Sequence, residues 1–234
     1  MITIVLPVYN EELVLKQNTL KLLNFCSKNI KSPWQIVISN NSSGDKTNII
    51  AQELSSQYHQ IKYFYTNNQG KGYGVIMAWQ KFPAQIYIYM DIDLSTSLEH
   101  LPELIQAIEQ NYDIATGSRL IKGAQVERSL SRKIISLSLR LILKILFNLK
   151  TKDAPCGFKA ANQKTIDQII PQIQNKTWFF DTEMIILAEK KEYKIKQIPI
   201  NWQEKKHPER QSKVGVATVI KDYIKNIYKI YVRK

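Results

Sequence analysis

The chain has 234 residues, of which 44% are hydrophobic, and carries a formal net charge of +13. This length and apolar content predict one large α/β domain, or a domain with a small appendage, and exclude a disordered chain. The positive charge favours an anionic partner, which can be nucleic acid, a phosphorylated substrate or an anionic membrane. Two cysteines, Cys26 and Cys156, are too few for a disulfide framework and lack metal-ligand spacing, so we expect reduced thiols in a cytoplasmic protein.

Strands and helices alternate along the first 120 residues. The patterns predict strands at 2–6, 35–39, 61–65, 86–90 and 113–117, and helices at 11–26, 47–57, about 71–81 and 101–110. The first segment indicates a strand and not a signal peptide. Glu11 and Glu12 are expected in the first turn of their helix, where the helix dipole favours acids. The alternation predicts a mostly parallel sheet flanked by helices on both faces.

Polar segments follow three of these strands, at residues 7–11, 40–45 and 91–93. In parallel sheets ligands bind outside the carboxyl ends of the strands, so we expect the three segments to converge on one crevice. Asp91 and Asp93 leave the strand 86–90 separated by one residue. Carboxylate oxygens suit Mg²⁺ or Mn²⁺, and Mg²⁺ commonly binds protein carboxylates together with substrate phosphates. The alternative is a solvated pair of strand-end acids.

Two basic amphipathic helices are predicted in the second half, at about 131–149 and 216–234. Polar side chains recur at every fourth position in the first, at Arg132, Ser136, Arg140, Lys144 and Asn148, and a basic stripe follows the second, at Lys221, Lys225, Lys229 and Arg233. Two interpretations stay open: core helices with a solvated basic edge, or interfacial helices on an anionic membrane. No window is apolar enough to span a bilayer. We expect no nucleic-acid partner, because no recognition motif is found.

Eight short motifs occur in a fixed order along nearly the whole chain. They are Pro7-Val-Tyr-Asn-Glu11, the segment 36–47, Gln69-Gly-Lys-Gly72, Asp91-Ile-Asp-Leu94, Gly117-Ser-Arg119, the segment 153–159, Phe179-Phe-Asp-Thr-Glu183 and Ile198-Pro-Ile-Asn-Trp202. This series resembles family 2 glycosyltransferases with the GT-A fold. In particular it is similar to polyprenyl-phosphate sugar synthases, such as the dolichyl-phosphate mannose and glucose synthases.

The resemblance implies an inverting, metal-dependent hexosyltransferase whose donor is a UDP- or GDP-hexose. The donor nucleotide would contact Pro7, Tyr9, Asn10, Glu11, Asn40, Lys71, Asp91, Ile92 and Asp93. Asp91 and Asp93 would hold Mg²⁺ or Mn²⁺ on the donor diphosphate. The glycines beside Lys71 would allow close backbone approach, and the lysine would supply a point charge for phosphate.

Three departures from the family pattern affect the donor site. Asn40 stands where relatives usually carry Asp, so the resemblance does not assign which nucleotide base is bound. Gln69 replaces a frequent Arg and removes one charge. Ser95 stands where mannose synthases often have Gln, so a third metal ligand is not assigned.

The implied acceptor is a polyprenyl (dolichyl or undecaprenyl) phosphate. A phosphate monoester is already an oxyanion near neutral pH, so it needs cations that orient it and no carboxylate base. The family positions for this task are Arg119, Arg132 and Ser136, with Arg128 and Lys213 as further candidates; Arg119 and Arg132 are the predicted catalytic cations. Asp153 and Glu183 would contact the sugar or position arginines, or else act as helix caps or buried partners. Cys156 is expected to be a packed small residue.

We expect a GT-A domain at 1–215, with a nucleotide-sugar half at 1–120, an acceptor half at 121–215, and a separate basic helix at 216–234. The protein would lie at the inner face of the membrane, with a membrane protein as a further candidate partner. Two alternatives stay open. One is a family 2 enzyme acting on a saccharide or protein hydroxyl, which would need a carboxylate base. The other is a non-catalytic nucleotide-sugar-binding protein.

Overall fold

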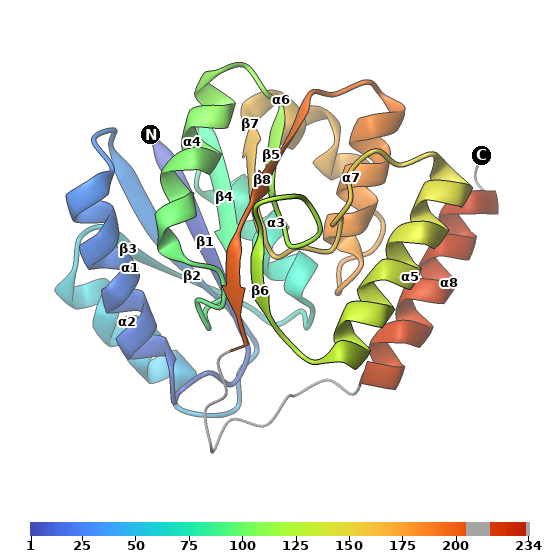
Figure 1. The fold of residues 1–234 in the computed structure, drawn as a ribbon. Helices are drawn as coiled ribbons and strands as arrows, with labels where there is room; N and C mark the ends of the chain where they lie inside the picture. Colours follow the sequence, from blue (N-terminus) through green and yellow to red (C-terminus); the bar gives the residue numbers. More distant parts are fainter. Residues whose placement is uncertain (205–215, 233–234) are drawn as a thin grey trace.

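Within residues 1–204 and 216–232, which the computed structural model describes, seven strands form one sheet in the order β3-β2-β1-β4-β7-β5-β8 (Figure 1). They are β1 (Ile2–Val8), β2 (Trp34–Asn41), β3 (Ile61–Thr66), β4 (Ile86–Met90), β5 (Ile114–Ser118), β7 (Phe158–Asn162) and β8 (Ile195–Pro199). A short second sheet pairs β6 (Gln125–Glu127) with β9 (Asn201–Gln203). The side chains of residues 131, 132, 216 and 217 lie outside the description.

Most strand pairs in the main sheet are parallel. Parallel pairs join β1 to β2 and β4, β2 to β3, and β5 to β8. The exception is β7, which lies between β4 and β5 and runs antiparallel to both. The predicted α/β architecture with a mostly parallel sheet is therefore confirmed. Strands from both sides of residue 120 share this sheet, and the division at that residue stays a prediction.

Helices cover both faces of the sheet. They are α1 (Leu15–Asn29), α2 (Thr47–Gln57), α3 (Lys71–Lys81), α4 (Leu101–Glu109), α5 (Leu130–Phe147), α6 (Gln163–Gln168), α7 (Phe180–Lys190) and α8 (Val216–Val232), with single turns η1 (Leu98–His100) and η2 (Ile170–Gln172). Successive strand residues point to opposite faces, so Ile88 joins the core under α1, α2 and α4, whereas Tyr89 joins the core under α3 and α7. Both α5 and α8 contribute to this second core, at Leu143, Tyr223 and Ile227.

The predicted helix at 11–26 begins later than expected. It starts at Leu15, and its first turn carries no acidic residue. Glu11 and Glu12 instead form the turn before it, where the Glu11 carbonyl accepts the backbone N–H of Leu15. The Glu12 carboxylate accepts the N–H of Lys46 at 3.0 Å, at the start of α2. The Glu12 carboxylate therefore lies at the amino end of α2 and not of α1. The helix dipole favours an acid at either position.

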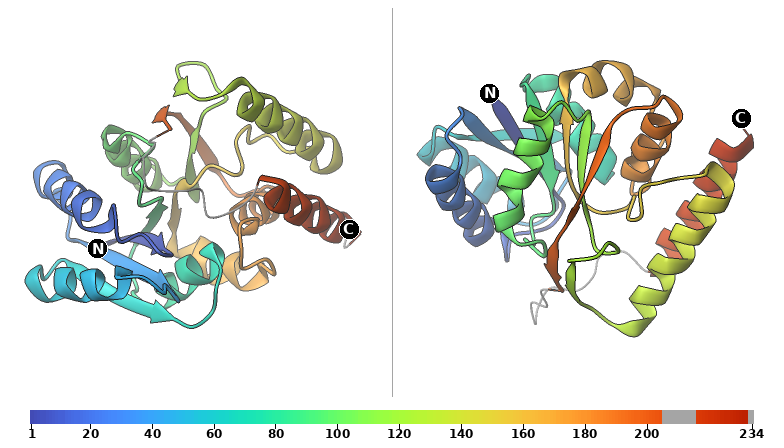
Figure 2. Two further views of the ribbon diagram at one scale, coloured as in Figure 1. Left: turned by 90° about the horizontal axis from the view of Figure 1, so that it is seen from below. Right: turned by 45° about the horizontal axis from the view of Figure 1, so that its top comes forward.

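The two basic helices of the second half occur close to their predicted ranges. Helix α5 ends at Phe147, because Asn148 takes a left-handed conformation with φ 51°. Both helices lie on one side of the molecule, away from α1 and α2 (Figure 2). The described residues contain no helix that combines the length and the apolar character needed to cross a membrane.

The outward faces of α5 and α8 are apolar. Side chains that are more than half exposed recur at helical spacing, at Leu130, Ile134, Leu137, Leu141 and Ile145 on α5 and at Ile224, Tyr228 and Val232 on α8. Their inward residues pack in the core, as Leu143 and Ile227 do. Each helix is thus partly a core helix. Its exposed surface also carries large apolar side chains, whereas a core helix with a solvated basic edge would expose mainly the basic stripe.

Trp79 provides a test of the packing beneath α3. Its indole is 1% exposed, donates from Nε1 to the Ile88 carbonyl at 3.3 Å, and meets Tyr87 and Tyr89 edge-on. Because Trp79→Ala leaves a large cavity, we expect the free energy of unfolding to fall by about 3–5 kcal/mol in a urea titration.

The matched control is Met77→Ala on the same helix, where the side chain is 40% exposed. Its expected change is about 0.5 kcal/mol. Equal losses in the two variants would show that Trp79 does not anchor α3 to the sheet.

Candidate active site

The loops that follow β1 and β2 are bonded to one another. Asn10 takes a left-handed conformation with φ 52°, which Asn tolerates better than most residues. Its backbone N–H donates to Ser43 Oγ at 2.9 Å, and its side-chain Oδ1 accepts the N–H of Gly44 at 2.7 Å. The N–H of Glu11 donates to Thr47 Oγ1 at 2.7 Å. The predicted convergence of segments 7–11 and 40–45 is therefore observed.

The predicted nucleotide-contacting residues differ in exposure. Tyr9 is 40% exposed beside these loops, and Pro7 pairs with Ser39 across the parallel strands. Asn40 is fully buried, and its Oδ1 accepts the N–H of Ser43 at 3.0 Å. In this structure Asn40 thus holds the loop after β2. Contacts of these residues with a nucleotide stay predictions.

The segment after β4 directs its two aspartates into one pocket. The side chain of Asp91 is 49% exposed, whereas Ile92 is buried and its carbonyl accepts from Asn18 Nδ2 at 2.9 Å. Asp93 Oδ1 accepts the backbone N–H of Ser95 at 2.9 Å. Both aspartates line a pocket of about 90 Å³, together with Ser95, Arg119, Gly157 and Trp202.

Lys71, the first residue of α3, forms an ion pair with Asp91. Lys71 Nζ lies 2.7 Å from Asp91 Oδ1. A Cβ atom at Gly157 would lie 2.8 Å from this Nζ and would overlap the Asp91 carboxylate, so the glycine makes room for the pair. Burial opposes the Lys71 charge, but Asp91, followed by Asp181, outweighs burial and raises the Lys71 pKa. Lys71 is therefore a cation at neutral pH.

The glycines beside Lys71 have a structural task. Gly70 has φ 138°, and a Cβ atom at Gly72 would lie 2.8 Å from the Lys176 carbonyl carbon and from Phe180 Cβ. The N–H of Gly72 donates to the Thr177 carbonyl at 3.1 Å. The close approach that these glycines permit is thus to the backbone at 176–177.

The two predicted metal ligands lie in the lining of this pocket. Asp91 and Asp93 both present oxygen ligands there, as Mg²⁺ and Mn²⁺ prefer. Among the described residues, no group of three or more His, Cys, Asp or Glu side chains could hold a metal ion. The pair fits a cation that takes its remaining ligands from a bound diphosphate and water, and does not form an all-protein cage.

Arg119 enters the pocket from the end of β5 and is held by Asp153. Arg119 Nε donates to Asp153 Oδ2 at 2.8 Å, and Nη2 donates to Oδ1 at 2.9 Å. Burial alone would raise the Asp153 pKa, but the Arg119 charge and hydrogen bonds outweigh it and lower that pKa. The guanidinium also lies 5.7 Å from the centre of the Trp202 ring. Of the alternatives for Asp153, the structure therefore supports the buried partner that positions an arginine.

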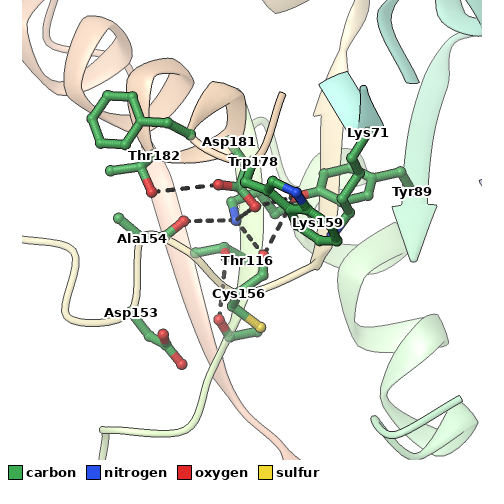
Figure 3. A network of polar contacts seen from close by, with 12 residues as sticks. Lys71, Tyr89, Thr116, Asp153, Ala154, Cys156, Lys159, Trp178, Asp181 and Thr182 are labelled. Atoms are coloured by element: carbon green, nitrogen blue, oxygen red, sulfur yellow. Dashed lines mark hydrogen bonds and ion pairs between the residues drawn. The ribbon is translucent and has the colours of Figure 1, made fainter. Parts of the chain in front are cut away.

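Lys159 and Asp181 form a buried charged pair that the sequence reasoning missed (Figure 3). Lys159 is fully buried, and its Nζ donates to the carbonyls of Ala154 and Cys156. Asp181 Oδ2 lies 3.8 Å from this Nζ and accepts from Tyr89 Oη at 2.8 Å. Burial lowers the Lys159 pKa, and Asp181 opposes that shift. The signal in the sequence was a lysine within an otherwise apolar strand.

The other predicted acceptor residues are only partly described. Arg128 Nη1 donates to Ser136 Oγ at 2.9 Å, so these two candidates are in contact where the chain enters α5. Arg132 belongs to α5, but its side chain lies outside the described residues, as does all of Lys213. A role for any of them in phosphate binding stays a prediction.

The remaining two residues of the sequence prediction, Glu183 and Cys156, contribute to the structure of the fold. The Glu183 carboxylate accepts the backbone N–H groups of Gln174 and Asn175, at 3.1 and 2.8 Å, so it stabilises the turn before α7. Cys156 is buried, and burial raises the pKa of its thiol to about 11. It is therefore a packed residue, as expected, and a poor nucleophile.

Comparison with known proteins identifies the family of this chain. The sequence matches the family Glycosyl transferase family 2 over residues 3–170, which is most of the chain, so the chain belongs to that family. It is 27% identical over 223 residues to dolichyl-phosphate beta-glucosyltransferase of Saccharomyces cerevisiae, covering 87% of this chain and 67% of the relative. Dolichol-phosphate mannosyltransferase of Pyrococcus furiosus is 29% identical over 238 residues, covering 98% and 63%.

A third relative is much longer than this chain. Glycosyltransferase AglD of Haloferax volcanii is 25% identical over 208 residues, which cover 87% of this chain and 33% of the relative. The chain thus spans one third to two thirds of the length of these relatives. Among solved structures, glucosyl-3-phosphoglycerate synthase of Mycobacterium tuberculosis, in complex with Mn²⁺, uridine diphosphate and phosphoglyceric acid, matches with a TM-score of 0.66 at 15% identity. The match covers 90% of this chain and 72% of that one, and supports the GT-A fold.

The Arg119–Asp153 pair predicts a defined pH dependence of stability. Asp153→Asn removes the ion pair, and breaking a buried pair lowers the free energy of unfolding by roughly 3–5 kcal/mol at pH 7. Because the native pKa of Asp153 lies below its ordinary value of 3.8, the pair stabilises the fold above about pH 4 and loses this effect as pH falls through the native pKa. The difference between wild type and variant, measured by denaturant titration, should therefore shrink below pH 4.

Asp167→Asn on α6 serves as the control, because that carboxylate is exposed. We expect it to change stability by about 0.5 kcal/mol. A deficit in Asp153→Asn that stays constant from neutral to acidic pH would contradict the assignment.

Proposed function

We propose that this chain transfers a hexose from a nucleoside diphosphate to a polyprenyl phosphate, with inversion at the anomeric carbon. The observation that carries this proposal is one small pocket lined by two aspartates and a held arginine, with a lysine paired to one of the aspartates. Asp91 and Asp93 offer oxygens for a metal, while Arg119, fixed by Asp153, and Lys71 offer positive charge. Relatives along most of the chain are named as dolichyl-phosphate sugar transferases, which supports the same reaction.

The donor side of the proposal assigns the leaving diphosphate to Asp91, Asp93 and Lys71. Mg²⁺ or Mn²⁺ bound there would neutralise charge on the diphosphate as the glycosidic bond breaks. Lys71 adds a point charge that burial makes stronger than it would be in water. The loops at 7–11 and 40–45 would take the base and ribose, with uracil and guanine both open.

The acceptor side uses the charge that the lipid phosphate already carries. A phosphate oxygen attacks the anomeric carbon in line as the bond to the nucleoside diphosphate breaks, so an α-linked donor gives a β-linked product. Arg119 is held in a bidentate pair and can orient the phosphate without reorganising. Arg132, Ser136, Arg128 and Lys213 are the further candidates for this contact. Since no proton must be removed from the acceptor, no general base is assigned.

In the proposed reaction, α5 and α8 would lie at the cytoplasmic face of an anionic membrane. Their outward apolar stripes would enter the headgroup region, and the neighbouring lysines would lie near anionic headgroups, at about 1 kcal/mol each. This arrangement brings the lipid phosphate toward the pocket from the acceptor side. The same stripes can contact a separate membrane protein.

Asp91→Ala tests the metal-dependent donor site. In detergent or vesicles that contain polyprenyl phosphate, with Mg²⁺ and a UDP- or GDP-hexose, we expect wild-type transfer that excess chelator stops. The variant should lose at least about 100-fold in rate, because the charge on the leaving diphosphate is no longer compensated. Product formation is followed by thin-layer chromatography of the radiolabelled lipid.

Glu109→Ala, at an exposed acid on α4, is the control and should keep the wild-type rate. Circular dichroism and thermal unfolding check that Asp91→Ala keeps its fold. Full transfer by the Asp91 variant, or by wild type in excess chelator, would refute the metal role.

A double substitution, Ile134→Glu with Ile145→Glu, tests membrane contact. Both side chains lie on the apolar stripe of α5 and are 64% and 72% exposed. Placing charges there opposes insertion, so we expect binding to anionic vesicles in a flotation assay to fall at least about tenfold. The remaining binding should weaken further as salt is raised.

Ile49→Glu, on α2 where the side chain is 56% exposed, is the control for added charge. It should leave flotation nearly unchanged. If the control and the α5 variant lose binding to the same extent, the stripe is not the membrane contact.

A further inference from the structure

A second pocket, of about 320 Å³, lies between α8 and the turn 174–177 that precedes α7. Polar side chains dominate its lining, among them Asn175, Lys176, Lys225 and Lys229. Of the described residues, none lines both this pocket and the pocket at Asp91 and Asp93. The function proposed above leaves this second pocket without a task.

The two carboxylates of this pocket already accept hydrogen bonds from the protein. The Glu183 oxygens accept the backbone N–H groups of the turn 174–177. Asp222 accepts from Thr177 Oγ1 at 3.2 Å and from Asn226 Nδ2 at 2.8 Å. These acids therefore hold the walls of the pocket through hydrogen bonds.

The three lysines are in a different situation. Lys176 comes from the turn, and Lys225 and Lys229 come from successive turns of α8. Within the described part of the chain, none of their ammonium groups lies within 4.0 Å of a carboxylate. Burial lowers the pKa of Lys176, and the charge of Glu183 partly opposes this shift. Two structural elements thus bring three lysines to one polar pocket that also holds two carboxylates, so the charge of its lining is positive on balance.

We propose that this pocket binds a phosphate-bearing anion, which bridges α8 and the turn 174–177. Three ammonium groups supply charge-assisted hydrogen bonds of the kind that phosphate accepts. The volume of about 320 Å³ lies at the small end of ligand pockets and suits a phosphorylated headgroup or a short polyphosphate. The anion can come from a lipid headgroup or from solution.

The bridge would act on the pocket at Asp91 and Asp93, called the transfer pocket below, through the amino end of α3. The carbonyls of Lys176 and Thr177 accept the N–H groups of Tyr73 and Gly72, at 2.9 and 3.1 Å. The ring of Trp178 lies 5.7 Å from Lys71 Nζ. An anion that holds the turn thereby steadies the segment that carries Lys71. This consequence rests on the proposed function, whereas binding of the anion does not.

Titration with inorganic pyrophosphate in excess chelator tests the site directly. The double variant Lys176→Gln/Lys229→Gln removes two pocket cations, and Lys62→Gln/Lys221→Gln removes two exposed cations outside the pocket. By calorimetry we expect the pocket variant to bind at least about tenfold more weakly than wild type, and the control to stay within about twofold. Thermal unfolding checks the fold of each variant.

Amide hydrogen exchange then locates the ligand. Protection by pyrophosphate at 174–178 and along α8 would support the proposal. Protection confined to the loops at 8–12, 41–47 and 91–95 would place the ligand at the transfer pocket and overturn it. Equal weakening in the two double variants would overturn it too, because surface charge alone would then explain the binding.

Vesicles distinguish the two sources of the anion. With phosphatidylcholine vesicles that contain phosphatidylglycerol, protection of 174–178 that Lys176→Gln abolishes and Lys62→Gln preserves would assign the site to a lipid headgroup. Protection by pyrophosphate but not by these vesicles would assign it to a soluble anion. No protection by either would refute the site. These assays use neither donor nor acceptor, so failure of sugar transfer leaves their outcome unaffected.

Discussion

Charge held out of water, wholly or in part, near the ends of β4, β5 and β7 is the constraint on which this structure depends. An ion taken out of water costs several kcal/mol unless a partner lies close by. The structure meets this requirement with ion pairs between different elements: Lys71 with Asp91, Arg119 with Asp153, and Lys159 with Asp181. Each pair joins segments far apart in the sequence. The helices α3 and α7 and the ends of β4 and β5 must therefore meet in one arrangement, and the pocket at Asp91 and Asp93 is formed near their junction.

The reversed strand β7 makes that arrangement possible. Parallel strands end at one edge of a sheet, so an antiparallel strand begins at the same edge. Met90, the last residue of β4, pairs with Phe158, the first residue of β7. The segment before β7 therefore reaches the carboxyl ends of its neighbours, where Gly157 lies against Asp91 and Asp153 holds Arg119. A parallel strand in this position would bring its first residues to the opposite edge.

Local patterns in the sequence predicted much of the fold and part of the site. Alternating strands and helices gave the sheet, and the position of Asp91 after an apolar strand placed it at the crevice. The predicted start of α1 was wrong, because the Glu12 carboxylate accepts a hydrogen bond from the start of α2. Local helix propensities contain no information on such a long-range contact. Lys159 and Asp181 were missed for a similar reason, since a lysine in an apolar strand shows that a partner exists but not which one. The pocket beside α8 depends on three separate segments and had no local signal.

The amino end of α3 contacts both pockets, because Lys71 pairs with Asp91 and Tyr73 lines the second pocket. A helix amino end normally offers its free N–H groups to phosphate. Here the N–H groups of Gly72 and Tyr73 donate to carbonyls of the turn before α7, so this backbone is already satisfied. In the proposed donor site, positive charge toward the diphosphate would then come from the Lys71 side chain, which reaches Asp91. The same hydrogen bonds tie Lys71 to the turn that walls the second pocket, so the glycines that admit the turn link the two sites.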